Sequence, residues 1–228
     1  AFLINALGAR NVAVVAQELG AKLIHISTDY VFGGVGETLV VSHKSGGGKP
    51  LPYTEFDTPI PISVYGKSKL AGENFIRHLC PKHFIVRSSG LFGVAGASGK
   101  GGNFVETMLR LAKERDELRV VNDQVFSPTY TKDLAGKIAQ LIETEYYGIF
   151  HITNKGSCSW YEFAKEILKL AGLKAPVIPI TSDQYPQKAR RPHYSVLHNY
   201  HLRLLGLDDM RTWQEALKNY MISKGYIK

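Results

Sequence analysis

Two short apolar runs constrain the fold of this chain more than any other feature, because each follows a helical pattern. KLIHIST (22–28) comes after an amphipathic stretch over 6–19, and HFIVRSS (83–89) comes after a second one that ends near Leu79. Runs of this length that are rich in β-branched residues are typical of buried parallel strands. Strands that alternate with helices predict an α/β fold, with a parallel sheet flanked by helices.

The rest of the chain continues this alternation and then becomes irregular. In the first helix, Val12, Val15 and Leu19 share one stripe. We expect further helices over 103–115, 131–144, 160–171 and about 209–224, and a strand over 148–153. Four prolines between positions 176 and 192 interrupt any regular pattern before the last helix. The sequence therefore predicts a sheet-containing part and a smaller lobe.

The composition is that of an ordinary globular protein, with 44% hydrophobic and 21% charged residues among 228. The net charge of +8 suits an anionic ligand such as a nucleotide diphosphate, while the scattered basic residues do not indicate nucleic acid as a partner. No apolar run reaches the ~18 residues of a membrane span, so no membrane partner is indicated. Cys80 and Cys158 lack metal-ligand spacing, so we expect no metal site, and reduced thiols in a cytoplasmic protein.

The segment PISVYGKSKLAGE (61–73) carries the residues with the clearest chemical meaning. Tyr65 and Lys69 are four positions apart at the start of an expected helix, so their side chains share one face. An ammonium beside a phenol favours the phenolate and lowers its pKa from about 10, which would allow proton exchange near neutral pH. The same spacing recurs at Tyr161 and Tyr220, so spacing alone does not establish a catalytic pair.

Position in the sheet separates Tyr65 from the other two tyrosines. Ligands of a parallel α/β sheet bind beyond the carboxyl ends of its strands, and Ser27, Thr28 and Asp29 lie at such an end. The helix of Tyr65 begins at the same edge. We therefore expect the hydroxyl of Thr28, the phenol of Tyr65 and the ammonium of Lys69 to converge on one point.

Three glycine-rich segments look like phosphate loops but lack the required context. SGGGKP (45–50) has proline where such a loop needs Ser or Thr, and GGVGE (33–37) is most simply a turn. GVAGASGKGGNF (93–104) places three residues between its glycine pattern and the expected helix. We interpret 93–104 as a loop that covers the substrate, and 40–55 as an exposed insertion.

Seven segments carry a resemblance to a known family. They are ISTDYVFGG (26–34), PISVYGKSKLAGE (61–73), FIVRSSGLFG (84–93), GGNFVETML (101–109), DQVFSPTYTKDLA (123–135), GIFHITNKGSCSWYEFAKEIL (148–168) and RRPHYSVL (190–197). In this order they resemble the dTDP-4-dehydrorhamnose reductases, which are extended short-chain dehydrogenases/reductases. The resemblance implies a Rossmann-like nucleotide-binding domain over 1–92, with 131–153 returning to it, and a smaller substrate-binding lobe over 93–130 and 154–228.

The resemblance also implies a reaction, the reduction by NADPH or NADH of the 4-keto group of a nucleotide-activated deoxysugar. Tyr65 would be the proton donor, Lys69 would bind the nicotinamide ribose and tune Tyr65, and Thr28 would bond the reacting oxygen. This agrees with elementary chemistry, because hydride addition to a ketone leaves an alkoxide that an acid must protonate. The remaining implied contacts are Ile26, Ser27, Ser88 and Ser89 to the cofactor, and Asp29, Gly90, Asn103, Arg190 and Arg191 to the sugar nucleotide. The expected partners are the nucleotide-sugar substrate and a second copy of the chain, which would form a homodimer.

Several of these residues also have simpler interpretations, which the sequence leaves open. Asp29 suits a turn and Asn103 suits the N-cap of a helix. The arginines at 190–191 suit solvated surface. Trp160 and Trp213 are most simply anchors of the core.

Two departures from the family keep other functions open. Gly90 stands where the rhamnose-forming reductases usually have a tryptophan over the sugar, so an aromatic platform is missing there. The glycine-rich first turn and the strands that precede the helix at 6–19 in the family are not among these residues. The sequence is therefore a piece of a longer protein or a remnant without the usual pyrophosphate cradle. The alternatives are a non-catalytic NAD(P)-binding regulatory subunit of the same fold, and an epimerase or reductase of another nucleotide sugar.

Overall fold

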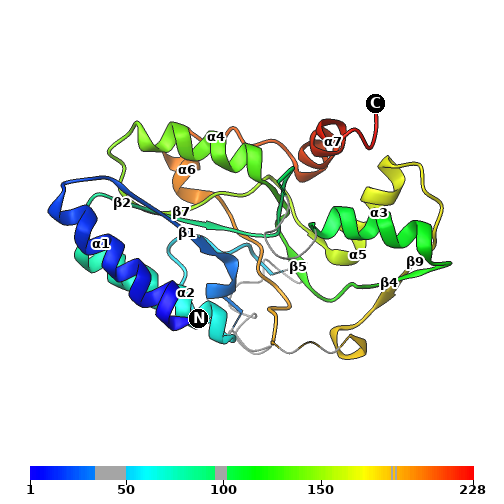
Figure 1. Cartoon of the computed structure of the whole chain (residues 1–228), viewed down its shortest axis with the longest axis horizontal. Helices are drawn as coiled ribbons and strands as arrows, with labels where there is room; N and C mark the ends of the chain where they lie inside the picture. Colours follow the sequence, from blue (N-terminus) through cyan, green and yellow to red (C-terminus); the bar gives the residue numbers. More distant parts are fainter. Residues whose placement is uncertain (34–49, 96–101, 186, 188) are drawn as a thin grey trace.

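A computed structural model describes residues 1–33, 50–95, 102–185, 187 and 189–228 (Figure 1). Parts of the glycine-rich segments and of the expected insertion lie outside these ranges, namely 34–49 and 96–101. The interpretations of 33–37, 40–55, 45–50 and 93–104 therefore stay predictions.

Among the described residues, three parallel strands form the sheet of the first lobe, as the sequence predicts. β1 (Leu23–Thr28) pairs with β2 (His83–Ser88), and β2 pairs with β7 (Gly148–His151). The register places Thr28 opposite Ser88, so polar side chains of both strands meet at the carboxyl edge of the sheet.

Helices cover both faces of this sheet (Figure 1). On one face lie α1 (Ala9–Glu18), which continues a π-helical turn at Leu3–Gly8, and α2 (Val64–Leu79). On the other face lie α4 (Thr131–Ile142) and α6 (Tyr200–Leu204). In the ranges given above, no helix combines the length and the hydropathy that a bilayer crossing requires.

The packing face of α1 differs from the apolar stripe in the sequence. Ala9, Ala13 and Ala16 are buried against α2, whereas Val12 and Val15 are 55% and 51% exposed. Small side chains at a contact allow two helices to approach closely. The periodic pattern of large apolar residues in the sequence does not reveal this packing face, because the face consists of alanines.

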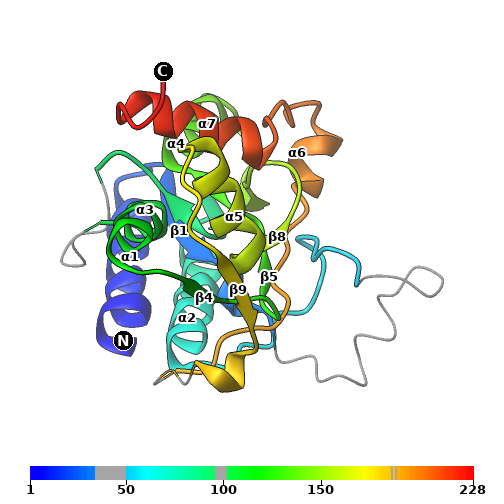
Figure 2. The ribbon, with the colours of Figure 1, turned by 90° about the vertical axis from the view of Figure 1, so that its right-hand side faces the viewer.

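The second lobe is built from helices around short strand pairs (Figure 2). Its helices are α3 (Phe104–Glu114), α5 (Trp160–Leu170) and α7 (Trp213–Ser223). The parallel pairs are β3 (Leu91–Phe92) with β6 (Thr129–Tyr130), and β4 (Leu118–Val121) with β9 (Val177–Ile180); β5 (Val125–Phe126) pairs antiparallel with β8 (Cys158–Ser159). Two 3-10 turns, η2 (Asp29–Val31) and η4 (Ser182–Gln184), complete the elements used below.

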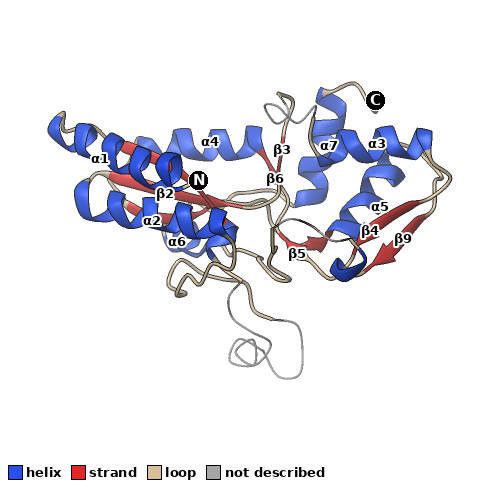
Figure 3. Cartoon of the chain, turned by 60° about the horizontal axis from the view of Figure 1, so that its bottom comes forward, coloured by secondary structure: helices blue, strands red, loops and turns tan. Residues whose placement is uncertain are grey.

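The sheet of the first lobe and the β4–β9 pair of the second lobe lie at opposite ends of the molecule (Figure 3). The chain passes between the lobes more than once, and Leu202 and Met210 pack against Phe84 and Phe150 of the sheet. Part of 154–228 thus returns to the first lobe, while the domain boundaries themselves stay predictions. The last helix begins at Trp213 rather than near 209, because Thr212 caps it.

Candidate active site

A cavity of about 400 Å³ opens at the carboxyl edge of the sheet and brings together most of the predicted site residues. Those that line it are Ile26, Ser27, Thr28, Asp29, Tyr65, Ser88, Ser89, Gly90 and Arg191. Arg190 lines an adjoining cavity of about 620 Å³, which shares Arg191 and Gln124 with the first. Asn103 is not among the lining residues of either cavity.

Thr28 and Tyr65 meet because β1 ends where α2 begins. Both side chains line the cavity, and the Thr28 hydroxyl lies close enough to the Tyr65 phenol to affect its pKa. Ser63 caps α2 by accepting a hydrogen bond from the Gly66 amide at 3.0 Å. A Cβ at Gly66 would lie 2.1 Å from the carbonyl oxygen of Tyr30, so only glycine allows this first turn to lie so close to the end of β1.

Burial raises the pKa of Tyr65 above its usual value, the Thr28 hydroxyl opposes this effect, and the charge of Asp29 adds to it. The expectation that Lys69 lowers the pKa of Tyr65 is therefore wrong for this structure. Tyr65 is a neutral phenol at pH 7, which is the form that can donate a proton.

Lys69 forms its hydrogen bonds with β1. Its ammonium donates to the carbonyl oxygen of Ile26 at 2.5 Å and lies 3.2 Å from Nε2 of His25. Burial lowers the pKa of Lys69, and the charge of Glu73 opposes this effect. Burial, followed by the charge of Lys69, lowers the pKa of His25 to about 4. The imidazole is therefore neutral at pH 7 and accepts from the ammonium.

Asp29 is a buried acceptor for hydroxyl groups. Ser89 Oγ and Ser195 Oγ donate to its Oδ2 at 2.7 and 2.6 Å, and Thr28 Oγ1 donates to Oδ1 at 3.1 Å. Burial raises the pKa of Asp29, while these three hydrogen bonds oppose the rise. The carboxylate thus fixes hydroxyls from three segments around the cavity, and a direct contact with substrate stays a prediction.

Ser88 offers an unused hydroxyl to the cavity. Its Oγ is buried and has no hydrogen-bond partner within the described part of the chain. A buried polar group without a partner costs roughly 1–3 kcal/mol. A ligand that bonds this hydroxyl would remove that cost.

Behind the cavity, a buried ion pair joins α2 to β2. Arg87 Nη2 and Nε donate to the Glu73 carboxylate at 2.6 and 3.0 Å, and Ser27 Oγ donates to the same carboxylate. Arg87 Nη1 also lies 3.5 Å from Nε2 of His151 on β7. Burial, and then the charge of Arg87, hold the pKa of His151 well below its usual value. Ser27 therefore faces this ion pair, although it also lines the cavity.

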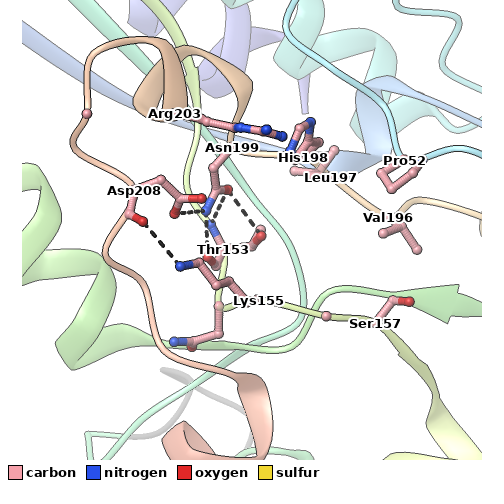
Figure 4. A pocket seen from close by; sticks show the side chains of 13 residues that line it. Pro52, Thr153, Lys155, Ser157, Val196, Leu197, His198, Asn199, Arg203 and Asp208 are labelled. Atoms are coloured by element: carbon pink, nitrogen blue, oxygen red, sulfur yellow. Dashed lines mark hydrogen bonds between the residues drawn. The ribbon is translucent and has the colours of Figure 1, made fainter.

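A separate cavity of about 550 Å³ lies at the end of β7. Its described lining includes none of the predicted site residues (Figure 4). Asn199 Oδ1 accepts from the Thr153 amide at 3.0 Å, and Asn199 Nδ2 donates to Asp208 at 3.2 Å. Lys155 Nζ donates to the carbonyl oxygen of Asp208 at 3.2 Å. Because these polar groups pair with one another, we assign them the role of holding the α6 region on β7.

Asn103 is the N-cap of α3, which confirms the simpler interpretation of this residue. Its Oδ1 accepts from the Glu106 amide at 3.2 Å, and its Nδ2 donates to the Gly93 carbonyl at 3.1 Å and to the Tyr220 hydroxyl at 2.9 Å. These bonds occupy the side chain. Over the residues with assigned positions, no cluster of three or more His, Cys, Asp or Glu could hold a metal ion.

Sequence reasoning missed several residues of the cavity. Ser195 reaches Asp29 from 166 positions away, and Gln124 arrives from the second lobe. No local sequence pattern predicts that Ser195 or Gln124 lines the cavity. Trp160 packs against the core of the second lobe, as the sequence indicates, but Trp160 and Phe126 also line the cavity. Their place at the ends of short strands facing the first lobe emerges only from the tertiary fold.

Comparisons with known proteins give one consistent family. Residues 1–225 match the family described as RmlD substrate binding domain. The chain is 43% identical over 221 residues to the spore coat polysaccharide biosynthesis protein SpsK of Bacillus subtilis, covering 97% of this chain and 71% of that protein. It is 38% identical over 232 residues to dTDP-4-dehydrorhamnose reductase of Escherichia coli, with 96% and 71% covered. A crystal structure of dTDP-4-dehydrorhamnose reductase from Bacillus anthracis in complex with NADP superposes with a TM-score of 0.86, at 48% identity, covering 98% of this chain and 73% of that one.

Proposed function

The chain belongs to the RmlD substrate-binding-domain family, and from this membership we propose that it is an NAD(P)H-dependent reductase of the 4-keto group of a nucleotide-activated deoxysugar. The substrate is dTDP-4-dehydrorhamnose and the product is dTDP-rhamnose. The observation that carries this proposal is that the hydroxyl of Thr28 and the phenol of Tyr65 line one cavity at the carboxyl edge of the sheet, where both can donate to a bound carbonyl oxygen. A relative with this reaction in its name matches nearly the whole chain.

The cavity suits a nicotinamide cofactor, NADPH or NADH. The hydroxyl of Ser88, which has no hydrogen-bond partner among the described residues, and the 40% exposed side chain of Ile26 lie on it. Lys69 contacts the carbonyl oxygen of Ile26 on β1. We assign Ile26, Ser88 and Lys69 to hold the nicotinamide and its ribose. When bound, the reduced nicotinamide supplies the hydride.

The chain's own residues supply the proton and stabilise the charge. As negative charge develops on the carbonyl oxygen, Tyr65 donates its phenolic proton to it, and the Thr28 hydroxyl turns from Asp29 to donate a hydrogen bond to the same atom. The ammonium of Lys69, which donates to the carbonyl oxygen of Ile26, holds α2 against β1 beside this pair. Asp29 keeps the hydroxyls of Ser89 and Ser195 in place beside the reacting group.

A cytoplasmic location and a homodimer belong to the same proposal. Cys80 and Cys158 are both free and buried, which suits a reducing compartment. Arg191, which lines the cavity and the adjoining one, suits a diphosphate through charge-assisted hydrogen bonds. Light scattering of the purified protein tests the dimer.

Tyr65→Phe tests the proposed reaction. Loss of the phenolic proton should lower turnover of dTDP-4-dehydrorhamnose by roughly 10²–10⁴, while the dissociation constant for NADPH stays within about twofold of wild type. Tyr161→Phe is the matched control. Tyr161 has the same spacing to a lysine, and Nζ of Lys165 lies 5.3 Å from the centroid of its ring, but Tyr161 is not among the lining residues of the cavity. It should keep wild-type turnover. A wild-type protein that binds NADPH but turns over no 4-keto sugar nucleotide would support the regulatory alternative instead.

A further inference from the structure

An aromatic stack forms part of the wall of the cavity that contains Thr28 and Tyr65. The rings of Phe126 and Trp160 are stacked, with centroids 3.9 Å apart and an interplanar angle of 25°. Both residues line the cavity, but Phe126 is only 4% exposed whereas Trp160 is partly exposed. Phe126 therefore backs the indole. The remaining surface of Trp160 lies between this cavity and a neighbouring one of about 330 Å³, where the Phe104 ring lies 4.7 Å from it, centroid to centroid, at an angle of 54°.

Gly90 leaves the space that this stack occupies. A Cβ at Gly90 would lie 2.3 Å from Cε2 and 2.4 Å from Cδ2 of Phe126, and the backbone of Gly90 has φ +53°. Its carbonyl oxygen accepts from the Thr129 amide at 3.2 Å, which ties this backbone to the segment after Phe126. Any side chain at position 90 would therefore displace Phe126 and, with it, the indole of Trp160.

The rest of the cavity wall includes polar side chains. Thr28, Ser88, Ser89 and Ser195 line it with hydroxyl groups. A pyranose ring carries hydroxyls at its edge and C–H groups on its faces, and the C–H faces pack well on aromatic rings. A 6-deoxysugar adds a methyl group, which favours an apolar neighbour further.

We propose that the indole of Trp160 is the surface against which the deoxysugar ring packs, and that Gly90 and Phe126 are a matched pair that fixes its position. This rests on the proposed function, since it names the sugar contact of the same site. The aromatic platform that the sequence lacks at position 90 is then supplied by position 160. Trp160 contacts substrate, and Phe126 is a positioning residue.

Substitution of Trp160 separates a sugar contact from a structural role. In Trp160→Leu, the KM for dTDP-4-dehydrorhamnose should rise about tenfold, while kcat and the dissociation constant for NADPH change less than about threefold. Trp160→Phe should restore most of the affinity. The control is Trp213→Phe, in the core of the second lobe, which should keep the wild-type KM. An unchanged KM in Trp160→Leu would overturn the proposal.

Fluorescence tests the same contact by ligand binding and needs no turnover. The chain has two tryptophans, and Trp213→Phe leaves Trp160 as the reporter. Titration with dTDP-rhamnose should change its emission, whereas titration with dTDP should not. Equal changes with both ligands would mean that the nucleobase, not the sugar, packs on the indole, and would overturn the proposal.

A double-mutant cycle tests the matched pair. Gly90→Ala alone should raise the KM about tenfold, because the new Cβ displaces Phe126; in the Phe126→Leu background the same change should cost less than about threefold. Circular dichroism verifies that each variant is folded. Equal fold-changes in the two backgrounds would contradict the coupling between positions 90 and 126.

Discussion

The ammonium of Lys69 can bond to Nε2 of His25 only while the imidazole is neutral. The pKa of His25 is about 4 in the folded chain, because of burial and the charge of Lys69, against 6.5 as its usual value. Between these two values the unfolded chain binds a proton that the folded chain excludes. The free energy of unfolding therefore rises with pH across this window and is independent of His25 above and below it.

We expect His25 to reduce the free energy of unfolding by about 3 kcal/mol as the pH falls from 6.5 to 4. His25→Asn should lack this part of the pH dependence, although His151, whose pKa is also lowered, contributes in the same direction in both proteins. Urea unfolding at half-unit pH steps measures the difference. The exposed His78→Asn is the control and should follow wild type. Parallel curves for wild type and His25→Asn would contradict the prediction.

At the scale of elements, the helices of the second lobe share one device at their start. Capping boxes open α3 at Asn103 and Glu106, α5 at Ser159 and Glu162, and α7 at Thr212 and Glu215. Two of these caps also bond to other segments: Asn103 donates to Tyr220 on α7, and Ser159 donates to Oδ1 of Asn122. The side chain of Asn103 thus caps the start of α3 and joins α3 to α7.

Asn103→Ala should lower the free energy of unfolding by about 2 kcal/mol, since it removes a cap and a buried hydrogen bond. Thr212→Ala, the exposed cap of α7 whose side chain bonds, among the described residues, only within its capping box, should cost about 1 kcal/mol. Urea unfolding measures both, and steady-state kinetics on the folded variants measures the KM for the sugar nucleotide. A raised KM with little loss of stability would favour the substrate contact that the family resemblance implies for Asn103.

The same elements show what the sequence could predict. The bounds of α2 and α5 follow from local signals, the caps at Ser63 and Ser159 and the periodic apolar residues after them. The pair β5–β8 does not, because each strand has two residues and the pairing joins Val125 to Ser159. Small strands without a hydrophobic period give no local signal.

The candidate site also has features that the sequence could predict and features that it could not. Thr28 and Tyr65 could be predicted to meet, because a strand end and a helix start share one edge of a parallel sheet. The direction of Lys69 could not, because the carbonyl oxygen of Ile26 attracts its ammonium and the i, i+4 spacing says nothing of that acceptor. Ser195 and Trp160 enter through tertiary packing alone.

At the scale of the molecule, one buried polar network ties the first lobe together. The Glu73–Arg87 pair joins α2 to β2, Ser27 adds β1 and His151 adds β7. Both charged side chains are almost fully buried, at 2% and 1% exposure. Removing one partner would leave the other as an uncompensated buried charge.

Arg87→Met or Glu73→Leu alone should therefore lower the free energy of unfolding by about 3–5 kcal/mol. The double variant should lose clearly less than the sum, since no lone charge remains. Urea unfolding of all four proteins gives the coupling energy. The exposed pair Arg110–Glu114 supplies a control cycle, with a coupling of about 0.5 kcal/mol or less. Strict additivity for Glu73 and Arg87 would contradict the prediction.

The return of Leu202 and Met210 to the sheet has a consequence for how the protein is made. Phe84 and Phe150 lie on a face of the sheet that these late residues complete. At the usual speed of translation, the ribosome delivers α6 on the order of ten seconds after β2. Throughout that interval the nascent chain carries an uncovered apolar surface, of the kind that chaperones bind. The first lobe therefore completes its folding only when synthesis has passed Met210.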